Sequence, residues 1–181
     1  MLRLAAFLRG MNLGRRRISN ADLRAHVEAL GFVEVATFRA SGNVILTAPD
    51  DDALDAVARR LEAGLREALA YDVPVFARSA ERVRAIAALE PFSGAELAAS
   101  TGKQQVMLLR EAPSAAARRA ALALAPAGDR FVFDGAELHW LPAAGLSDSE
   151  LDLNALAKAI GHATVRTKGT IELIAAKHFG E

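Results

Sequence analysis

Apolar residues recur along the chain at two spacings, which predict an alternation of strands and helices. Continuous or alternating apolar runs favour strands, whereas apolar residues three or four positions apart favour amphipathic helices. The elements predicted in the first half are, in order, a strand at 4–8, a helix at 19–30, strands at 32–39 and 43–47, a helix from 50 to 69, a strand at 72–78 and a helix at 79–89. This order is β-α-β-β-α-β with one added helix.

Short polar and glycine signals mark the ends of these elements. Ser19 and Asp22 are spaced like a capping box before the first helix, and Gly31 is a stop signal after it. The turn Ser41–Asn43 is typical of a hairpin, because its glycine supplies a positive φ between two strands. The acids Asp50–Asp52 are placed to begin the long helix, where negative charge favours the positive end of the helix dipole.

The second half repeats the same element order. Its predicted elements are a strand at 104–110, a helix at 114–124, strands at 130–133 and 137–141, a helix from 147 to 160, a short strand at 162–166 and a last helix at 170–179. Asp134-Gly135 is a strong hairpin signal between its middle strands, and Ser147 with Glu150 predicts the cap of its second helix.

The element order predicts an α+β fold made of two tandem ferredoxin-like subdomains, each βαββαβ plus a helix, with antiparallel sheets. The predicted boundaries are 1–90 for the first subdomain, 91–103 for a linker and 104–181 for the second subdomain. Pro91, Gly94 and Gly102 interrupt the periodic pattern within this linker.

Composition narrows the classes of function. Lys plus Arg equals Asp plus Glu at 22 each, so whole-molecule attraction to nucleic acid or to an anionic membrane is not expected. The absence of cysteine excludes thiol nucleophiles, disulfides and thiolate metal sites. The apolar run between Arg3 and Arg9 is too short for a signal peptide or a membrane span. We therefore expect a soluble, cytoplasmic protein without a membrane partner.

The topology predicts one candidate site, where the loop after the first strand meets the hairpin between the second and third strands. The residues brought together there are Arg9, Gly10, Asn12, Gly14, Arg15, Ser41, Gly42 and Asn43. Arginine offers planar paired donors to carboxylate or phosphate, and glycine lets the backbone approach a ligand closely. Tyr71 and Asp72 are expected at the same end of the sheet.

Plainer interpretations account for part of this pattern. Only four of the 22 basic residues are lysines, so Arg15–Arg17 are equally explained as a solvated loop in a chain that uses arginine throughout. Turn chemistry alone explains Ser41–Asn43. The segment "GMNLG" matches neither dinucleotide nor P-loop fingerprints, and the strand "NVILT" lacks the aromatic residues that RNA recognition requires. The histidine spacing predicts no metal site, and no cofactor is expected.

Five segments together resemble the domain of unknown function 1697 family of bacteria. They are "LRGMNLG" (Leu8–Gly14), "ADLRAHVEALGF" (Ala21–Phe32), "SGNVIL" (Ser41–Leu46), "PF" (Pro91-Phe92) and "TVRTKGT" (Thr164–Thr170). The resemblance implies a small soluble α+β protein with no assigned activity. Its pattern marks the two blocks of the candidate site and adds Arg166 and Thr170 from the last segment.

Two features depart from that family pattern. Thr167, Lys168 and Gly169 stand where the family usually has Asn-Trp-Asn, and Arg15 replaces a second glycine after Gly14. An aromatic stack or an amide clamp beside Arg166 is therefore not available from these positions. The alternative for Arg166 is that it ends a strand and faces solvent.

Three functional hypotheses follow. The first is the binding of a small anion, such as phosphate, a nucleotide or a carboxylate, by Arg9, Asn12 and Arg15, oriented by Ser41 and Asn43 with Arg166 as a contributor. The second is an interaction module whose open sheet edges form a homodimer or bind a partner. The third is an enzyme that uses Tyr71 or Asp72 as acid or base.

Overall fold

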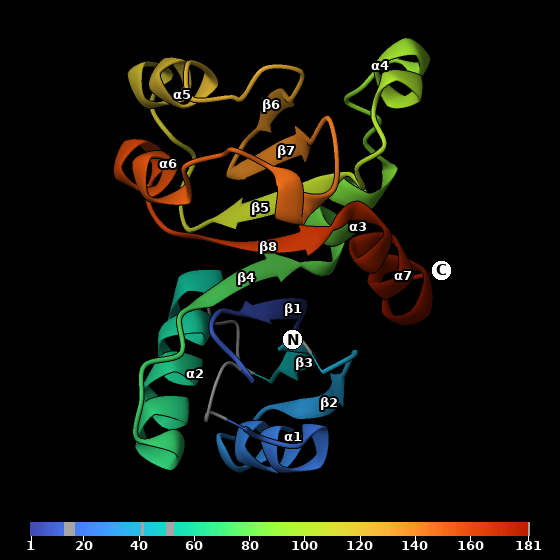
Figure 1. The fold of residues 1–181 in the computed structure, drawn as a ribbon. Helices are drawn as coiled ribbons and strands as arrows, with labels where there is room; N and C mark the ends of the chain where they lie inside the picture. Colours follow the sequence, from blue (N-terminus) through green and yellow to red (C-terminus); the bar gives the residue numbers. More distant parts are fainter. Residues whose placement is uncertain (13–16, 41, 50–52, 181) are drawn as a thin grey trace. The chain divides into compact units, whose positions relative to one another are not determined.

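The computed structural model of the chain contains two α+β units, each built on a four-stranded antiparallel sheet (Figure 1). It describes residues 1–12, 17–40, 42–49 and 53–180. Unit 1 comprises residues 1–86 and 174–181, and unit 2 comprises residues 87–173. The predicted fold class, two tandem ferredoxin-like subdomains with antiparallel sheets, is confirmed.

Unit 1 follows the predicted order of elements. These are β1 (Leu2–Leu8), α1 (Asn20–Ala29), β2 (Val33–Thr37), β3 (Asn43–Ala48), α2 (Leu54–Leu69), β4 (Val75–Ser79) and most of α3 (Ala80–Ala88). The strands lie in the order β2-β3-β1-β4, and every neighbouring pair is antiparallel. This arrangement places the exits of β1 and β2 at the same end of the sheet.

The helices of unit 1 begin where local chemistry favours it. The Ser19 hydroxyl accepts the Asp22 backbone N–H at 3.0 Å, so the predicted cap of α1 is present. Gly31 follows that helix with a φ of 85°, a conformation that glycine adopts without steric cost. The predicted caps Asp50–Asp52 lie outside the described residues, and α2 begins after Ala53, which makes no side-chain cap.

One face of the unit 1 sheet carries the helix-packed core. Alternate residues of the central strands point to this face and are buried against apolar residues three or four positions apart on α1 and α2. The central members of this core are Leu4, Ala6, Leu8, Val44, Leu46, Leu23, Val27, Val57, Leu61 and Leu65. Full burial of each leucine or valine contributes roughly 1.5–3 kcal/mol, so this face fixes the register of the sheet.

Unit 2 repeats the architecture. Its elements are α4 (Gly94–Ala99), β5 (Gln105–Leu109), α5 (Ala115–Leu122), β6 (Arg130–Asp134), β7 (Glu137–Leu141), the 3-10 turn η1 (Leu146–Asp148), α6 (Leu153–Ile160), β8 (Ala163–Thr167) and the first part of α7 (Lys168–His178). The strand order is β6-β7-β5-β8, again with antiparallel neighbours. The short predicted strand near residue 164 is β8, which pairs with β5.

A buried carboxylate organises the core of unit 2. Trp140 packs with Met107 and Leu138, and its indole N–H donates to the Asp129 carboxylate at 2.7 Å. The other carboxylate oxygen accepts the Ala143 backbone N–H at 2.9 Å. These bonds satisfy the indole and both carboxylate oxygens, so a buried charge is tolerated beside the apolar cluster.

The second half differs from the sequence prediction in two local details. The segment 91–103 contains the short helix α4, which begins after a reciprocal capping box between Ser93 and Glu96. The cap predicted at Ser147 and Glu150 is not formed, and α6 starts instead at Leu153. The Asp152 carboxylate accepts the backbone N–H groups of Asn154 and Ala155, each at 2.9 Å, so Asp152 caps the start of the helix.

The C-terminal residues group with unit 1 rather than with unit 2. The Arg84 guanidinium donates to the Phe179 carbonyl oxygen at 3.2 Å, and the His178 ring meets Phe38 edge-on with centroids 6.1 Å apart. The predicted domain boundaries stay a prediction. Within the described part of the chain, no helix is long and apolar enough to cross a membrane.

Candidate functional site

The loop after β1 and the β2–β3 hairpin lie side by side in unit 1. Phe7 pairs with Asn43, and the Leu8 backbone N–H donates to the Gly42 carbonyl oxygen at 2.7 Å. The Asn12 side chain reaches the Ala40 carbonyl oxygen at 3.0 Å. The structure therefore brings together the two segments that the topology placed at one end of the sheet.

Asn12 holds the loop after β1. Its φ is 56°, a left-handed conformation that asparagine tolerates better than most residues. Its amide nitrogen donates to Ala40, and its side-chain oxygen accepts the Ile18 backbone N–H at 2.9 Å. Both ends of the side chain are thus engaged within the protein, and Asn12 links the hairpin to the entry of α1.

Asn43 and Gly42 close the hairpin. The Asn43 side chain is buried and donates to the Phe38 carbonyl oxygen at 2.9 Å, while the backbone carbonyl oxygen of Asn43 accepts the Phe38 N–H at 2.9 Å. Gly42 has a φ of 71°, and an added Cβ would lie 2.9 Å from Met11 Cγ and 3.0 Å from Leu8 Cβ. Both residues have clear structural reasons to occupy these positions.

Arg9 differs from these neighbours. It is half-buried at the end of β1, and its backbone N–H donates to the Pro74 carbonyl oxygen at 2.9 Å. Its guanidinium makes no hydrogen bond or ion pair with any residue in the described ranges. Gly10 beside it has a φ of 76° and open space where a Cβ would stand. Gly14, Arg15 and Ser41, also predicted here, lie outside the described residues.

The segment before β4 reaches the same end of the sheet through Pro74. Asp72 there is exposed and lies 3.6 Å from the Arg66 guanidinium, and Tyr71 packs in part against the unit 1 core. Neither Tyr71 nor Asp72 lies in a site that shields its side chain from water. Among the described residues, no group of three or more His, Cys, Asp or Glu side chains could hold a metal ion.

The remaining predicted residues, Arg166 and Thr170, belong to unit 2. Arg166 is buried rather than facing solvent, and it donates to the Thr164 hydroxyl and the Val165 carbonyl, each at 2.8 Å. Burial lowers the pKa of Arg166 to about 10. Thr170 bonds to the Thr167 hydroxyl at the start of α7, through its backbone N–H at 3.2 Å and its own hydroxyl at 2.9 Å.

Lys168, one of the departures from the family pattern, is also buried. Its ammonium pairs with Glu90 and lies 3.4 Å from the Glu172 carboxylate. Arg166, Lys168 and Thr170 therefore contribute to a polar framework around the start of α7. The structure gives each of them a role in holding this part of unit 2.

A model of a protein family of unknown function, DUF1697, matches residues 1–139. The chain belongs to the DUF1697 family. No curated protein matches the chain. A conserved bacterial protein, SP0830 from Streptococcus pneumoniae, has a similar fold, with a TM-score of 0.71 and 19% identity over 97% of each chain.

The extent of the DUF1697 match bears on the candidate residues. It includes the loop after β1 and the β2–β3 hairpin, and it ends within β7 before Arg166 and Thr170. The family match therefore covers the loop after β1 and the β2–β3 hairpin, which form the candidate site of unit 1. At this level of identity the likeness to the pneumococcal protein supports the fold alone.

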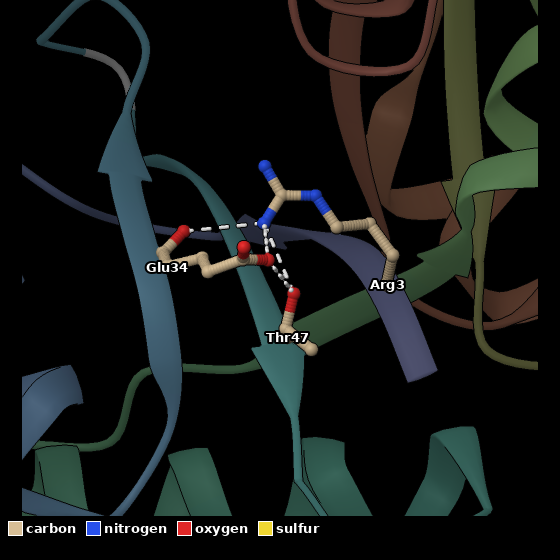
Figure 2. A network of polar contacts seen from close by, with 3 residues as sticks. All are labelled: Arg3, Glu34 and Thr47. Atoms are coloured by element: carbon tan, nitrogen blue, oxygen red, sulfur yellow. Dashed lines mark hydrogen bonds and ion pairs between the residues drawn. The ribbon is translucent and has the colours of Figure 1, made fainter. Parts of the chain in front are cut away.

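Sequence reasoning missed a polar network on unit 1 of this DUF1697 protein (Figure 2). The Arg3 guanidinium donates to the Glu34 carboxylate at 2.9 Å and to the Thr47 hydroxyl at 3.0 Å, and Thr47 donates to Glu34 at 2.7 Å. Glu34 has a φ of 51° in a register shift of β2. Simple strand alternation does not anticipate this bulge, which turns Glu34 toward Arg3 and Thr47.

Proposed function

We propose that the protein binds a small anionic ligand, such as a phosphate, a nucleotide or a carboxylate, at the loop after β1. The observation that supports this proposal is the guanidinium of Arg9, which stands at the strand exit without a partner among the described residues. Asparagine side chains nearby are engaged in holding the loop and the hairpin. Arg9 is thus the group available to a ligand.

The surrounding geometry favours binding by a pre-formed loop. Asn12 fixes the loop to the hairpin, and Arg9 is anchored through its backbone to Pro74. A loop held in this way loses less conformational entropy when a ligand binds. Gly10 leaves open space beside Arg9, so an oxyanion could approach both the guanidinium and the backbone. The proposed site also includes Gly14, Arg15 and Ser41, on the basis of the sequence.

The proposal predicts that one anion of a small screen binds through Arg9. Inorganic phosphate, adenosine monophosphate and citrate would be tested against the full chain by calorimetry. Because a charge-assisted hydrogen bond contributes about 1.5–3 kcal/mol, Arg9→Gln should weaken the affinity about tenfold or more. Arg59→Gln, which changes an exposed arginine of α2, is the matched control and should bind like the wild type.

The result that overturns the proposal is equally definite. It would be a screen in which no anion binds, or in which Arg9→Gln and the wild type bind each anion with the same affinity. Thermal unfolding of both variants checks that the comparison is made between folded proteins.

The alternative of an interaction module has less support at edge strand β2. Edge strand β2 has exposed Val33 at its start, but a register shift and the charged Glu34 follow immediately. Bulges and charges of this kind discourage pairing between sheet edges. A concentration-independent dimer in light scattering, disrupted by Ala36→Pro and unaffected by Arg9→Gln, would favour this alternative over anion binding.

A further inference from the structure

Unit 2 contains a partly open pocket of about 480 Å³. One wall is the loop between β5 and α5, and the other is the end of α6 with the turn into β8. Its principal lining residues are Arg110, Glu111, Pro113, Ala117, Ile160 and His162. Because all of them belong to unit 2, the pocket is complete within that unit.

We propose that this pocket binds a small molecule carrying one oxyanion group, a carboxylate or a phosphate monoester, on an apolar body. Its volume falls in the range of roughly 300–1,000 Å³ that is usual for small-molecule sites. The proposal concerns a second site and does not depend on the loop after β1.

The pocket lining offers groups for both the oxyanion and the apolar body of such a ligand. Arg110 offers the planar donors that suit an oxyanion, and His162 adds a ring nitrogen from the opposite wall. Pro113, Ala117 and Ile160 provide apolar surface between them. Glu111 places one negative charge at the same pocket, which disfavours a polyanion and favours a ligand with a single charged group.

The walls are held by bonds that leave the pocket in place without a ligand. The Arg118 guanidinium donates to the Pro113 carbonyl at 3.0 Å and to the Gly135 carbonyl at 3.2 Å, and it lies over the Phe133 ring at 5.5 Å. The Ser114 hydroxyl accepts the Ala117 N–H at 3.2 Å. Helices α5 and α6 contact each other, as Figure 1 shows for this unit.

The internal repeat places an arginine at the same position in both units. Arg110 directly follows β5, the first strand of the second ferredoxin-like unit, just as Arg9 directly follows β1 in the first. In both units the arginine begins the connection to the first helix of the sheet. Each unit therefore has an arginine at this position of the fold. In unit 2 this arginine, Arg110, lines the pocket.

The proposal is tested by titrating the full, nitrogen-15-labelled chain with benzoate, phenyl phosphate and benzamide. Benzoate, phenyl phosphate or both should give saturable shifts of the amide signals of Ala117, Gly161 and His162. Benzamide, a neutral analogue of benzoate, should bind about tenfold more weakly or worse, because it cannot form a charge-assisted bond with Arg110.

Four variants test whether the anions bind in this pocket and through Arg110. Arg110→Gln should weaken binding about tenfold or more, and Ala117→Leu should also weaken it, because the larger side chain narrows the pocket. Arg119→Gln, an exposed arginine on the same helix outside the pocket, should leave the affinity unchanged. Arg9→Gln should also leave it unchanged, so this proposal and the one for unit 1 succeed or fail separately.

The absence of saturable shifts with both anions would overturn the proposal. Equal affinities for benzoate and benzamide, or an Arg110→Gln protein that binds as well as the wild type, would overturn it as well. Because Arg110 is exposed, the spectrum of its variant should otherwise match that of the wild type.

Discussion

Single side chains decide how the candidate loop of unit 1 is held. Asn12 bridges Ala40 and Ile18, so Asn12→Ala removes two hydrogen bonds and places alanine at a φ of 56°. We expect the free energy of unfolding to fall by about 1–3 kcal/mol, measured by urea denaturation. Asn12→Asp keeps the acceptor for Ile18 and should lose less. Unchanged stability in the alanine variant would contradict the bridging role.

We expect His178 to make the stability of unit 1 depend on pH. Among the described contacts its buried Nε2 has no hydrogen-bond partner, and burial lowers its pKa, with further lowering by the charges of Lys177 and Arg3. The unfolded chain therefore takes up the proton at a higher pH than the folded chain does. The stabilisation is complete above the ordinary histidine pKa of about 6.5 and is lost as the pH falls below it toward the folded-state pKa.

Chemical denaturation at pH values from about 7.5 to 5.5, about one unit either side of that pKa, checks this expectation. The wild type should lose stability on acidification, His178→Gln should lose less, and Lys177→Gln should show an intermediate slope. Identical slopes in the wild type and His178→Gln would rule out His178 as the source.

At the same residue scale, the sequence predicted the neighbours of the site better than their roles. Strand order alone was enough to place the Asn12 loop beside the hairpin. The hydrogen bonds of the Asn12 side chain depend on a left-handed backbone angle at Asn12. The contacts of Glu34 with Arg3 and Thr47 depend on a bulge in β2. Neither feature has a spacing signal in the sequence, so the bridge at Asn12 and the network around Arg3 emerged only in three dimensions.

At the scale of elements, competition between caps explains where sequence reasoning was right and where it was wrong. The spacing of Ser19 and Asp22 predicts the cap of α1, and this prediction is confirmed. Before α6 the sequence offers Ser147, Asp148, Ser149 and Asp152 in succession, and a short 3-10 turn takes up Leu146–Asp148. Asp152 sets the start of α6, because its carboxylate accepts the backbone N–H groups of Asn154 and Ala155.

This competition predicts a difference between two alanine variants. Asp152→Ala should lower the free energy of unfolding by about 0.5–2 kcal/mol, because the first turn of α6 loses its cap. Ser147→Ala, the matched control, should change it by less than about 0.5 kcal/mol. The fluorescence of Trp140, the one tryptophan of the chain, reports directly on unit 2. Equal losses in both variants would count against the assigned start of α6.

At the scale of the whole molecule, the repeated element order sufficed to predict two ferredoxin-like units, but not the membership of the last residues. Phe179 is 3% exposed, and its segment groups with unit 1, although the sequence places it directly after the elements of unit 2. The apolar character of Phe179 predicts that its ring is buried. It carries no information on which of two similar cores receives the ring.

The assignment of the C-terminus to unit 1 has a measurable consequence. Phe179→Ala should destabilise the protein by about 3–5 kcal/mol, because a buried aromatic ring leaves a cavity. Hydrogen exchange should then quicken first at amides of β1, β4 and α3 in unit 1. Leu173→Ala, which trims an exposed leucine of α7, should have a much smaller effect. Faster exchange confined to β5–β8 would instead show that the C-terminal ring stabilises unit 2.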